Sequence, residues 1–379
     1  MNELFFTTKI LKLCYNLRTD NNMNEYLSHK LKIISFIAII FVVIVHSSNL
    51  HLSFTSGDQN FQSGYNMFIQ YFFSRGITRV ASPIFFCISG YLFFLNFKGT
   101  KDEFKNKYRK RARSVLLPYL LWSLWGIIFY FVLQQIPQSK NFFTRELIAD
   151  YSVNKILHTL FINPIPYQLW FLRDLIILII ISPLIYWLIK HFNFIPLIVF
   201  FVIWFGFFGF KYVIFRNDSI LFFSLGAYIS LYHKDILIKK LDKYYYLIFA
   251  FLWFLLVAIK TVLLMNNELF FLRSTLQSTS VLVGIIALWS AYDIIMKNIE
   301  MPNQTILNLC SFTFIIYVFH EPVLTIINKG LFYIFGTSEL KSLIIYFISP
   351  ALIISISILL GYILKKNTPK FYAFINGKR

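Results

Sequence analysis

Long apolar blocks separated by short polar segments fill almost all of this 379-residue chain. Hydrophobic residues make up 58% of the sequence and charged residues only 14%, whereas soluble domains are about a quarter charged. A soluble protein of this length cannot hide so much apolar surface, because even a large domain leaves much of its surface in water. The blocks do not alternate between apolar and polar residues, so they predict membrane helices and not the strands of a β-barrel.

A helix that crosses a membrane needs about 20 predominantly apolar residues. By this length, the sequence predicts an all-α integral membrane protein with about ten transmembrane helices in one bundle. The predicted spans are Leu31–Leu50, Arg79–Phe97, Ser114–Gln134, Leu169–Ile189, Phe194–Tyr212, Ser219–Tyr232, Tyr244–Met265, Leu276–Met296, Leu307–Ile327 and Leu343–Leu364.

Basic residues gather between the apolar blocks, and their positions predict the orientation of the chain. There are 36 Lys and Arg against 17 Asp and Glu, a formal net charge of +19. Basic residues in short loops set membrane topology and meet anionic headgroups, so we expect membrane lipids and no nucleic acid as partners. Lys and Arg are dense between positions 98 and 113, which predicts that this loop is cytoplasmic. Ten spans then place both termini on the cytoplasmic side.

The predicted organisation is a cytoplasmic N-terminal segment (1–30), a polytopic membrane domain (31–364) and a basic cytoplasmic tail (365–379). No small-residue cleavage pattern follows an apolar stretch in the first 30 residues, so no cleaved signal peptide is expected. The three cysteines have no paired spacing, which predicts neither a structural disulfide nor a metal site.

Ionisable residues within the predicted spans are functional candidates, since each costs several kcal/mol in a bilayer unless it is paired or hydrated. His46, near the outer end of the first span, is either an interfacial histidine or a general base for a hydroxyl proton. Tyr317 and His320 lie three positions apart in the ninth span and share a helix face. Arg79 opens the second span, where it either reaches out to the outer headgroups or serves the site. Arg173 lies about one turn into the fourth span, where it pairs with Asp174 or with a partner on another helix. The predicted topology places the two histidines and two arginines toward the outer side, which indicates one pocket.

A second group of candidates lies toward the cytoplasm. The segment KNKYRKRARSVLLPYLLW contains Arg109, Lys110 and Arg113. Its cation density suits either anionic lipid or the phosphates of a nucleotide-like donor, to which arginine makes planar multidentate contacts. In the second span, Gly90 either permits close helix packing, as small residues do in membranes, or serves a ligand.

Taken in order, six segments resemble the acyltransferase family 3 of membrane proteins. They extend from about Leu31 to Pro322, and the ordered set is more specific than any single hydrophobic pattern. The chain looks most like the branch that O-acetylates surface or exported polysaccharides. The segments are IAIIFVVIVHSS, RVASPIFFCISGYLFF, RKRARSVLLPYLLWS, YQLWFLRDLIILIIISPLIYWL, LFFSLGAYI and SFTFIIYVFHEPVL.

The resemblance implies an enzyme in a bacterial inner or plasma membrane that moves an acetyl group from cytoplasmic acetyl-CoA, as co-substrate, to a hydroxyl of a glycan or lipid-linked glycan. It implies no metal. It makes His46 the essential histidine, and its implied pocket residues are Arg79, Arg173, Tyr317 and His320. The residues that it assigns to the donor are Ser89, Gly90, Tyr91, Arg109, Lys110 and Arg113.

One position departs from the family pattern. Many relatives have Asp-x-x-Arg at the start of the first span, where this chain has Lys32-Ile33-Ile34-Ser35. Ser35 therefore stands in the place of an arginine. Either another cation takes over the role of that arginine, or the activity of this member is altered.

Two other classes of function fit the same composition. A transporter for an anion or a modified glycan also has about ten spans with buried Arg, Asp and His, although a carrier is favoured by an internal symmetry that this chain does not show. A scaffold or sensor with a binding pocket is the third class. For the enzyme, direct attack by the hydroxyl with His46 as base and a relay through an acylated His46 both fit the sequence.

Overall fold

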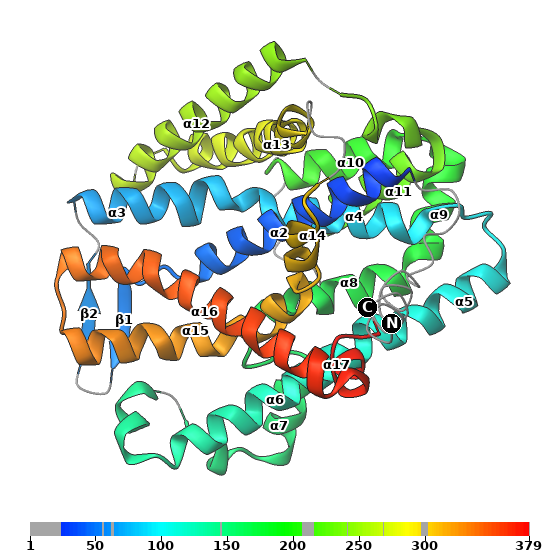
Figure 1. The fold of residues 1–379 in the computed structure, drawn as a ribbon. Coiled ribbons are helices and arrows are strands. Elements are labelled where there is room, and N and C mark those ends of the chain that lie inside the picture. The colour runs from blue at the N-terminus through cyan, green and yellow to red at the C-terminus, as the bar shows by residue number, and fades with distance from the viewer. Residues whose placement is uncertain are drawn as a thin grey trace, which may run out of the picture.

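The computed structural model describes residues 24–54, 57–61, 64–144, 146–206, 216–240, 242–267, 269–296 and 302–378. Within these ranges the chain is almost entirely helical, with one short antiparallel hairpin (Figure 1). The α-helices are α2 (Glu25–His46), α3 (Gly64–Gln70), α4 (Ala81–Phe94), α5 (Lys101–Arg111), α6 (Leu117–Gln134), α7 (Val153–Phe161), α8 (Trp170–Ile180), α9 (Ser182–Phe192), α10 (Ile195–Trp204), α11 (Asn217–Tyr232), α12 (Lys243–Met265), α13 (Phe270–Ile295), α14 (Gln304–Cys310), α15 (Thr313–Phe335), α16 (Glu339–Asn367) and α17 (Pro369–Ile375). The π-helical segments are η1 (Tyr71–Gly76) and η3 (Ala112–Leu116), the 3-10 segments are η2 (Ile77–Val80), η4 (Pro137–Phe142), η5 (Ile148–Asp150), η6 (Tyr167–Leu169) and η7 (Lys234–Leu237), and the strands are β1 (His51–Phe54) and β2 (Gly57–Asn60).

The two ends of the bundle differ in chemistry. The basic end is the side of the bundle where α2 begins and where α5 also lies, on the right in Figure 1. There Lys30 of α2 forms a buried ion pair with Asp293 at the end of α13, at 2.7 Å. At the opposite end, called the hairpin end below, β1 and β2 lie against α15 and α16 (Figure 1). Leu52 of β1 packs there on Phe332 and Ile345.

Six helical segments are long and apolar enough to cross a membrane, or up to eight if each of two bent pairs is one span. The chain is therefore a multi-pass membrane protein, but the predicted ten spans are not reached in the part of the chain that the structure describes. The shortfall lies in the predicted fifth and sixth spans. There α10 has 10 residues and α11 has 16, both short of a bilayer, and residues 207–215 lie outside the described ranges.

The second span is longer than predicted, since it runs over Gly64–Phe94. Arg79 consequently lies in the middle of this span and does not open it, which corrects the prediction. The added turns contain the polar residues Asn66 and Gln70. A search for long apolar stretches therefore does not include these turns in the span. Both side chains are buried, and both are hydrogen-bonded. Gln70 Nε2 donates to Asn66 Oδ1 (2.9 Å), and Asn66 Nδ2 donates to Ser342 Oγ (3.0 Å). These bonds offset the cost of burying the amides.

The predicted basic loop at 98–113 is mostly the helix α5. Thr100 begins it with a capping box, in which Thr100 Oγ1 accepts from the Glu103 amide and Glu103 Oε2 accepts from the Thr100 amide, each at 3.3 Å. This arrangement satisfies two amide groups that a helix start leaves without partners. Most charged side chains of α5, such as Arg109 and Lys110, are exposed and face water or headgroups, whereas Arg111 at its end is half-buried.

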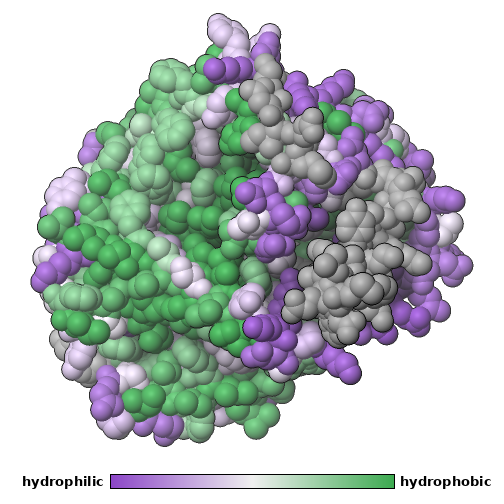
Figure 2. All heavy atoms as spheres, viewed as in Figure 1, coloured by the Kyte–Doolittle hydropathy of each residue, from purple (hydrophilic) through white to green (hydrophobic). Residues whose placement is uncertain are grey.

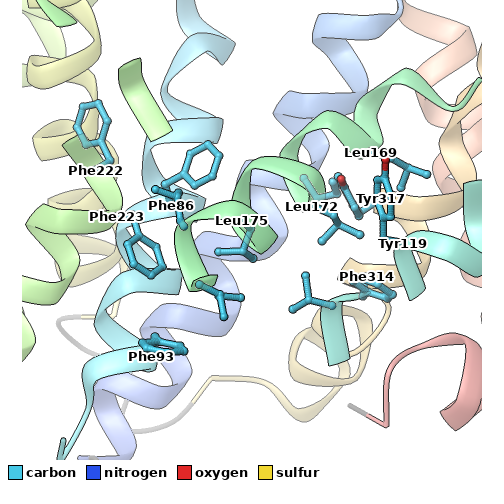
Figure 3. Packing of buried hydrophobic residues seen from close by; sticks show 14 of the residues in the cluster. Phe86, Phe93, Tyr119, Leu169, Leu172, Leu175, Phe222, Phe223, Phe314 and Tyr317 are labelled. Atoms are coloured by element: carbon cyan, nitrogen blue, oxygen red, sulfur yellow. The ribbon is translucent and has the colours of Figure 1, made fainter. Parts of the chain in front are cut away.

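The helices α4 and α11 pack with their backbones in contact. A Cβ atom on Gly90 would lie 2.0 Å from the Phe223 carbonyl oxygen, and one on Gly226 would lie 2.0 Å from the Cys87 carbonyl oxygen. Large aromatic residues fill the space beside this contact, as Figure 3 shows for Phe93 and Phe223, whose ring centroids are 6.2 Å apart. Two glycines thus set the distance between helices that carry much of the core.

The outer surface is largely apolar. Phe251 of α12 and Phe270 of α13 are 67% and 79% exposed. Figure 2 shows hydrophobic residues over the middle of one face and hydrophilic residues gathered toward the basic end. Such a surface is what a bilayer requires of helices that face lipid.

Candidate active site

A cavity of about 1030 Å³ runs inside the bundle. Both Lys32, near the start of α2, and His46, at its last residue, line this cavity. They are fourteen positions apart, and the helical rise of about 1.5 Å per residue separates them by about 21 Å. The cavity therefore reaches from the basic end well toward the hairpin end.

His46 and His320 face each other, with His46 Nδ1 3.3 Å from His320 Nε2. His320 is fully buried, and its Nδ1 lies 3.0 Å from the Ile316 carbonyl oxygen. A carbonyl oxygen only accepts, so His320 Nδ1 carries the hydrogen, and in the neutral ring Nε2 is an acceptor. His46 Nδ1 must then donate to His320. This leaves the lone pair on His46 Nε2 and assigns His46 the tautomer of a general base.

Residues of η6 hold the two histidines from one side. The Tyr167 ring stacks on His46 with centroids 4.7 Å apart, and its hydroxyl donates to Glu321 Oε1 at 3.1 Å. Gln168 Nε2 donates to the Glu321 carbonyl at 3.0 Å, while Tyr317 donates to the Gln168 carbonyl at 2.8 Å. A proline within a helix removes a backbone hydrogen bond, so Pro322 is expected to free carbonyl groups in α15. In the structure α15 does break at Glu321, but Gln168 occupies these carbonyls.

Arg79 and Tyr317 also line the cavity, as the sequence predicts for pocket residues, whereas Arg173 is not among its lining residues. Arg173 instead donates to the Ile162 carbonyl (3.0 Å) and to Asp174 Oδ1 (3.2 Å). A different arginine, Arg216, lines the cavity with Asp218, to which it is bonded at 3.0 Å. Arg173 thus holds the chain between α7 and α8, on the outside of the pocket wall.

At the basic end, three cations line the cavity, namely Lys32, Arg111 and Lys365. Burial raises the pKa of Tyr372, which lies among them, to about 12, so its hydroxyl stays protonated. This hydroxyl and Asn376 Oδ1 have no hydrogen-bond partner among the described residues. The basic end therefore offers both charge and unpaired polar atoms to a ligand.

The donor residues implied by the resemblance have mixed positions. Ser89 lines the cavity, Gly90 lies in the contact with α11, and Tyr91 is buried against Leu27 and Leu31. The exposed residues Arg109, Lys110 and Arg113 are not among the residues that line the cavity. A donor role for these six residues stays a prediction, which the geometry supports best for Ser89.

Several cavity residues were not singled out from the sequence as site residues. Lys32 is part of the departure from the family pattern, and Gln168 lies in the motif YQLWFLRD, in which Arg173 and Asp174 are the charged residues. Nothing in the sequence places Lys365, at the end of the last span, beside the first span. No group of three or more His, Cys, Asp or Glu that could hold a metal occurs within the described ranges.

Comparisons with known proteins identify the family of the chain. A sequence model of an acyltransferase domain matches residues 29–363, nearly the whole chain. The succinoglycan biosynthesis protein ExoH of Rhizobium meliloti (strain 1021) is 25% identical over 370 residues, which cover 94% of each chain. No solved structure matches the chain.

Proposed function

Because this chain belongs to the acyltransferase family, we propose that it transfers an acetyl group from cytoplasmic acetyl-CoA to a hydroxyl group of a surface or exported polysaccharide. One observation carries the proposal, which is the single cavity that joins cations at the basic end to His46. The printed name of the relative, a succinoglycan biosynthesis protein, supports a polysaccharide acceptor. Family membership favours this enzyme over a carrier or a scaffold.

The donor enters from the basic end, which faces the cytoplasm of a bacterial cell. Its phosphates bind Lys32, Arg111 and Lys365, and its pantetheine arm extends along the cavity past Ser35 and Ser89. A volume of about 1030 Å³ suits a ligand of this size, since pockets for small molecules reach roughly 1,000 Å³. Lys32 lies one helical turn before Ser35, so it supplies the cation that relatives carry at the Ser35 position.

The reaction proceeds at His46. Its Nε2 takes the proton of the sugar hydroxyl while the oxygen attacks the thioester carbonyl carbon. One edge of the Arg79 guanidinium, which has five N–H donors, stabilises the oxyanion of the tetrahedral intermediate and leaves its other donors for a second group. Collapse of the intermediate breaks the C–S bond, and the departing thiolate receives the proton from His46, which yields free coenzyme A and the sugar ester. His320 holds His46 in the required tautomer.

The acceptor binds from the hairpin end, beside Gln168. The Oε1 atom of Gln168 is buried without a partner among the described residues, and Gln168 lines the cavity. Because Gln168 Nε2 is occupied by carbonyl groups, Oε1 is left to accept a hydrogen bond from a second sugar hydroxyl.

The test uses proteoliposomes of the full chain with labelled acetyl-CoA and a soluble polysaccharide. We expect consumption of acetyl-CoA and an acetyl ester on the glycan, identified by mass spectrometry. Movement of glycan into the vesicles without a new ester would identify a carrier. Loss of an acetyl ester from the polysaccharide of cells that lack the protein gives the same answer in vivo.

The cations that line the basic end should determine donor affinity. We expect Lys365→Met to raise KM for acetyl-CoA roughly tenfold with little change in kcat, since a hydrogen bond to a charged group contributes about 1.5–3 kcal/mol. Steady-state kinetics in proteoliposomes measures this change. The matched control is Lys190→Met, an exposed lysine of α9 that does not line the cavity. A larger rise in KM for Lys110→Met than for Lys365→Met would place the phosphates on the exposed face of α5, outside the cavity.

A further inference from the structure

A group of cations lies in the half of the bundle nearer the hairpin end, without matching carboxylates. Arg75 and Arg79 lie four positions apart in the second span, and Lys260 lies near the end of α12. The described residues 64–94 and 243–267 contain no Asp or Glu, and in α13 the one carboxylate, Asp293, pairs with Lys30 at the basic end. Arg75 is exposed and lies over the Tyr71 ring at 4.8 Å, whereas Arg79 and Lys260 have no ion pair among the described residues. Unpaired charges within membrane spans are costly, so these two indicate a function.

Lys260 is held against the second span. The backbones approach closely there, because a Cβ atom on Gly76 would lie 2.3 Å from Val257 Cγ1 of α12. The Lys260 ammonium, 5% exposed, donates to the Arg75 carbonyl oxygen and to Gln277 Oε1 of α13. An ammonium only donates, so the acceptor atom of Gln277 must face Lys260.

The amide nitrogen of Gln277 is thereby turned away from Lys260. Gln277 lines the same cavity as Arg79, and the Arg79 side chain has no hydrogen bond or ion pair with the described residues. The segment η2, which carries Arg79, packs against α13, which carries Gln277, so donors from both elements face this part of the cavity. Among the lining residues the one carboxylate is Asp218, and it is bonded to Arg216.

We propose that Arg79 and Gln277, backed by Lys260, form a site for an oxyanion, a carboxylate or a phosphate, carried by the group that reacts beside His46. The inference rests on the proposed function and adds the chemical class of a substrate. The site lies toward the hairpin end, so the acceptor glycan is the expected carrier of the charge. Gln277 contacts the ligand, whereas Lys260 is a positioning residue that also supplies positive potential.

The experiment compares two acceptors and two donors in proteoliposomes of the full chain. The acceptors are a neutral oligosaccharide and the same oligosaccharide with one uronic acid; the donors are acetyl-CoA and the dicarboxylic succinyl-CoA. We expect the wild-type protein to prefer the uronic acid acceptor about tenfold or more in kcat/KM, the size of a hydrogen bond to a charged group. The Gln277→Glu variant keeps the side-chain shape but adds a negative charge, and it should reduce this ratio to about one. Lys260→Met should reduce it in the same direction.

The control is Arg273→Gln, which removes a cation near the same end of α13 that bonds to Asn267 and does not line the cavity. This variant should keep the wild-type ratio. A ratio does not depend on how much protein is folded, so partial unfolding of a variant does not imitate the result. A preference for succinyl-CoA that the Gln277→Glu variant loses would support the oxyanion site and assign the charge to the acyl group.

Equal transfer to neutral and charged substrates by the wild-type protein would overturn the oxyanion site and leave the acyltransferase proposal standing. No transfer with any pair of substrates would overturn both.

Discussion

Replacement of His46 by alanine should abolish acyl transfer while the protein still inserts and folds. His46 provides the only ring nitrogen of the histidine pair that the hydrogen bonds leave as a base toward the cavity. General acid–base catalysis contributes about 10²- to 10⁴-fold, so the rate constant should fall by at least this range. The rate of coenzyme A release in proteoliposomes, normalised to protein that elutes as a single peak in detergent, measures the loss.

The neighbouring histidine offers an internal comparison. His320→Ala leaves the base in place but removes the acceptor that sets its tautomer, so the loss should be smaller than for His46→Ala. Full activity of His46→Ala would remove this histidine from the mechanism. Mass spectrometric detection of an acylated His46 would favour a relay over direct attack.

Alanine at Gly226 should destabilise the bundle more than most single changes. Its Cβ would lie 2.0 Å from the Cys87 carbonyl oxygen and 2.7 Å from the Tyr91 amide nitrogen, so α4 and α11 would have to separate. Overpacking of this kind costs about 1–3 kcal/mol, and two rigid helix backbones leave little room to relax. Thermal unfolding in detergent should show a lower midpoint and a loss of folded protein.

The matched control is Gly330→Ala in α15, where an added Cβ meets no atom within 4 Å. Alanine favours a helix over glycine by about 1 kcal/mol, so this variant should unfold at the same or a higher temperature. An unchanged midpoint for Gly226→Ala would contradict the close contact. Gly90→Ala should resemble Gly226→Ala, which would explain Gly90 by packing alone.

The helical membrane fold and the meeting of His46 with His320 could both be anticipated from the sequence. Ionisable residues are rare in membrane spans, so their order along the chain and their depth restrict where they lie. The same reasoning places Arg79 in the pocket, although it misjudges the start of the span. The start of the span is misplaced because amide side chains such as Gln70 are costly in a membrane unless they are hydrogen-bonded, and the sequence does not show their partners.

The other residues that line the cavity could not be predicted from the order and depth of ionisable residues along the sequence. Successive residues of a helix point about 100° apart, so a run of basic residues does not reveal that Arg111 lines the cavity while Arg109 and Arg113 do not. Arg173 and Arg216 present the same difficulty. Each precedes or follows an apolar stretch, and their roles depend on how α8 and α11 are turned within the bundle.

The buried amides beyond His46 have a consequence for the cell. The cavity extends from the basic end to His46. Along α2, the barrier to ions therefore consists of the few residues between His46 and the hairpin end. There Asn49, Gln70 and Ser342 are fully buried and bonded to one another, with Gln70 Nε2 to Asn49 Oδ1 at 2.8 Å and Ser342 Oγ to Asn49 Oδ1 at 2.7 Å. Amide groups that are bonded to one another have few atoms left to bind water. We therefore expect this cross-linked layer to restrict ion leakage beside α2, so that the acceptor reaches His46 along η6 and Gln168 and not along the polar end of the first span.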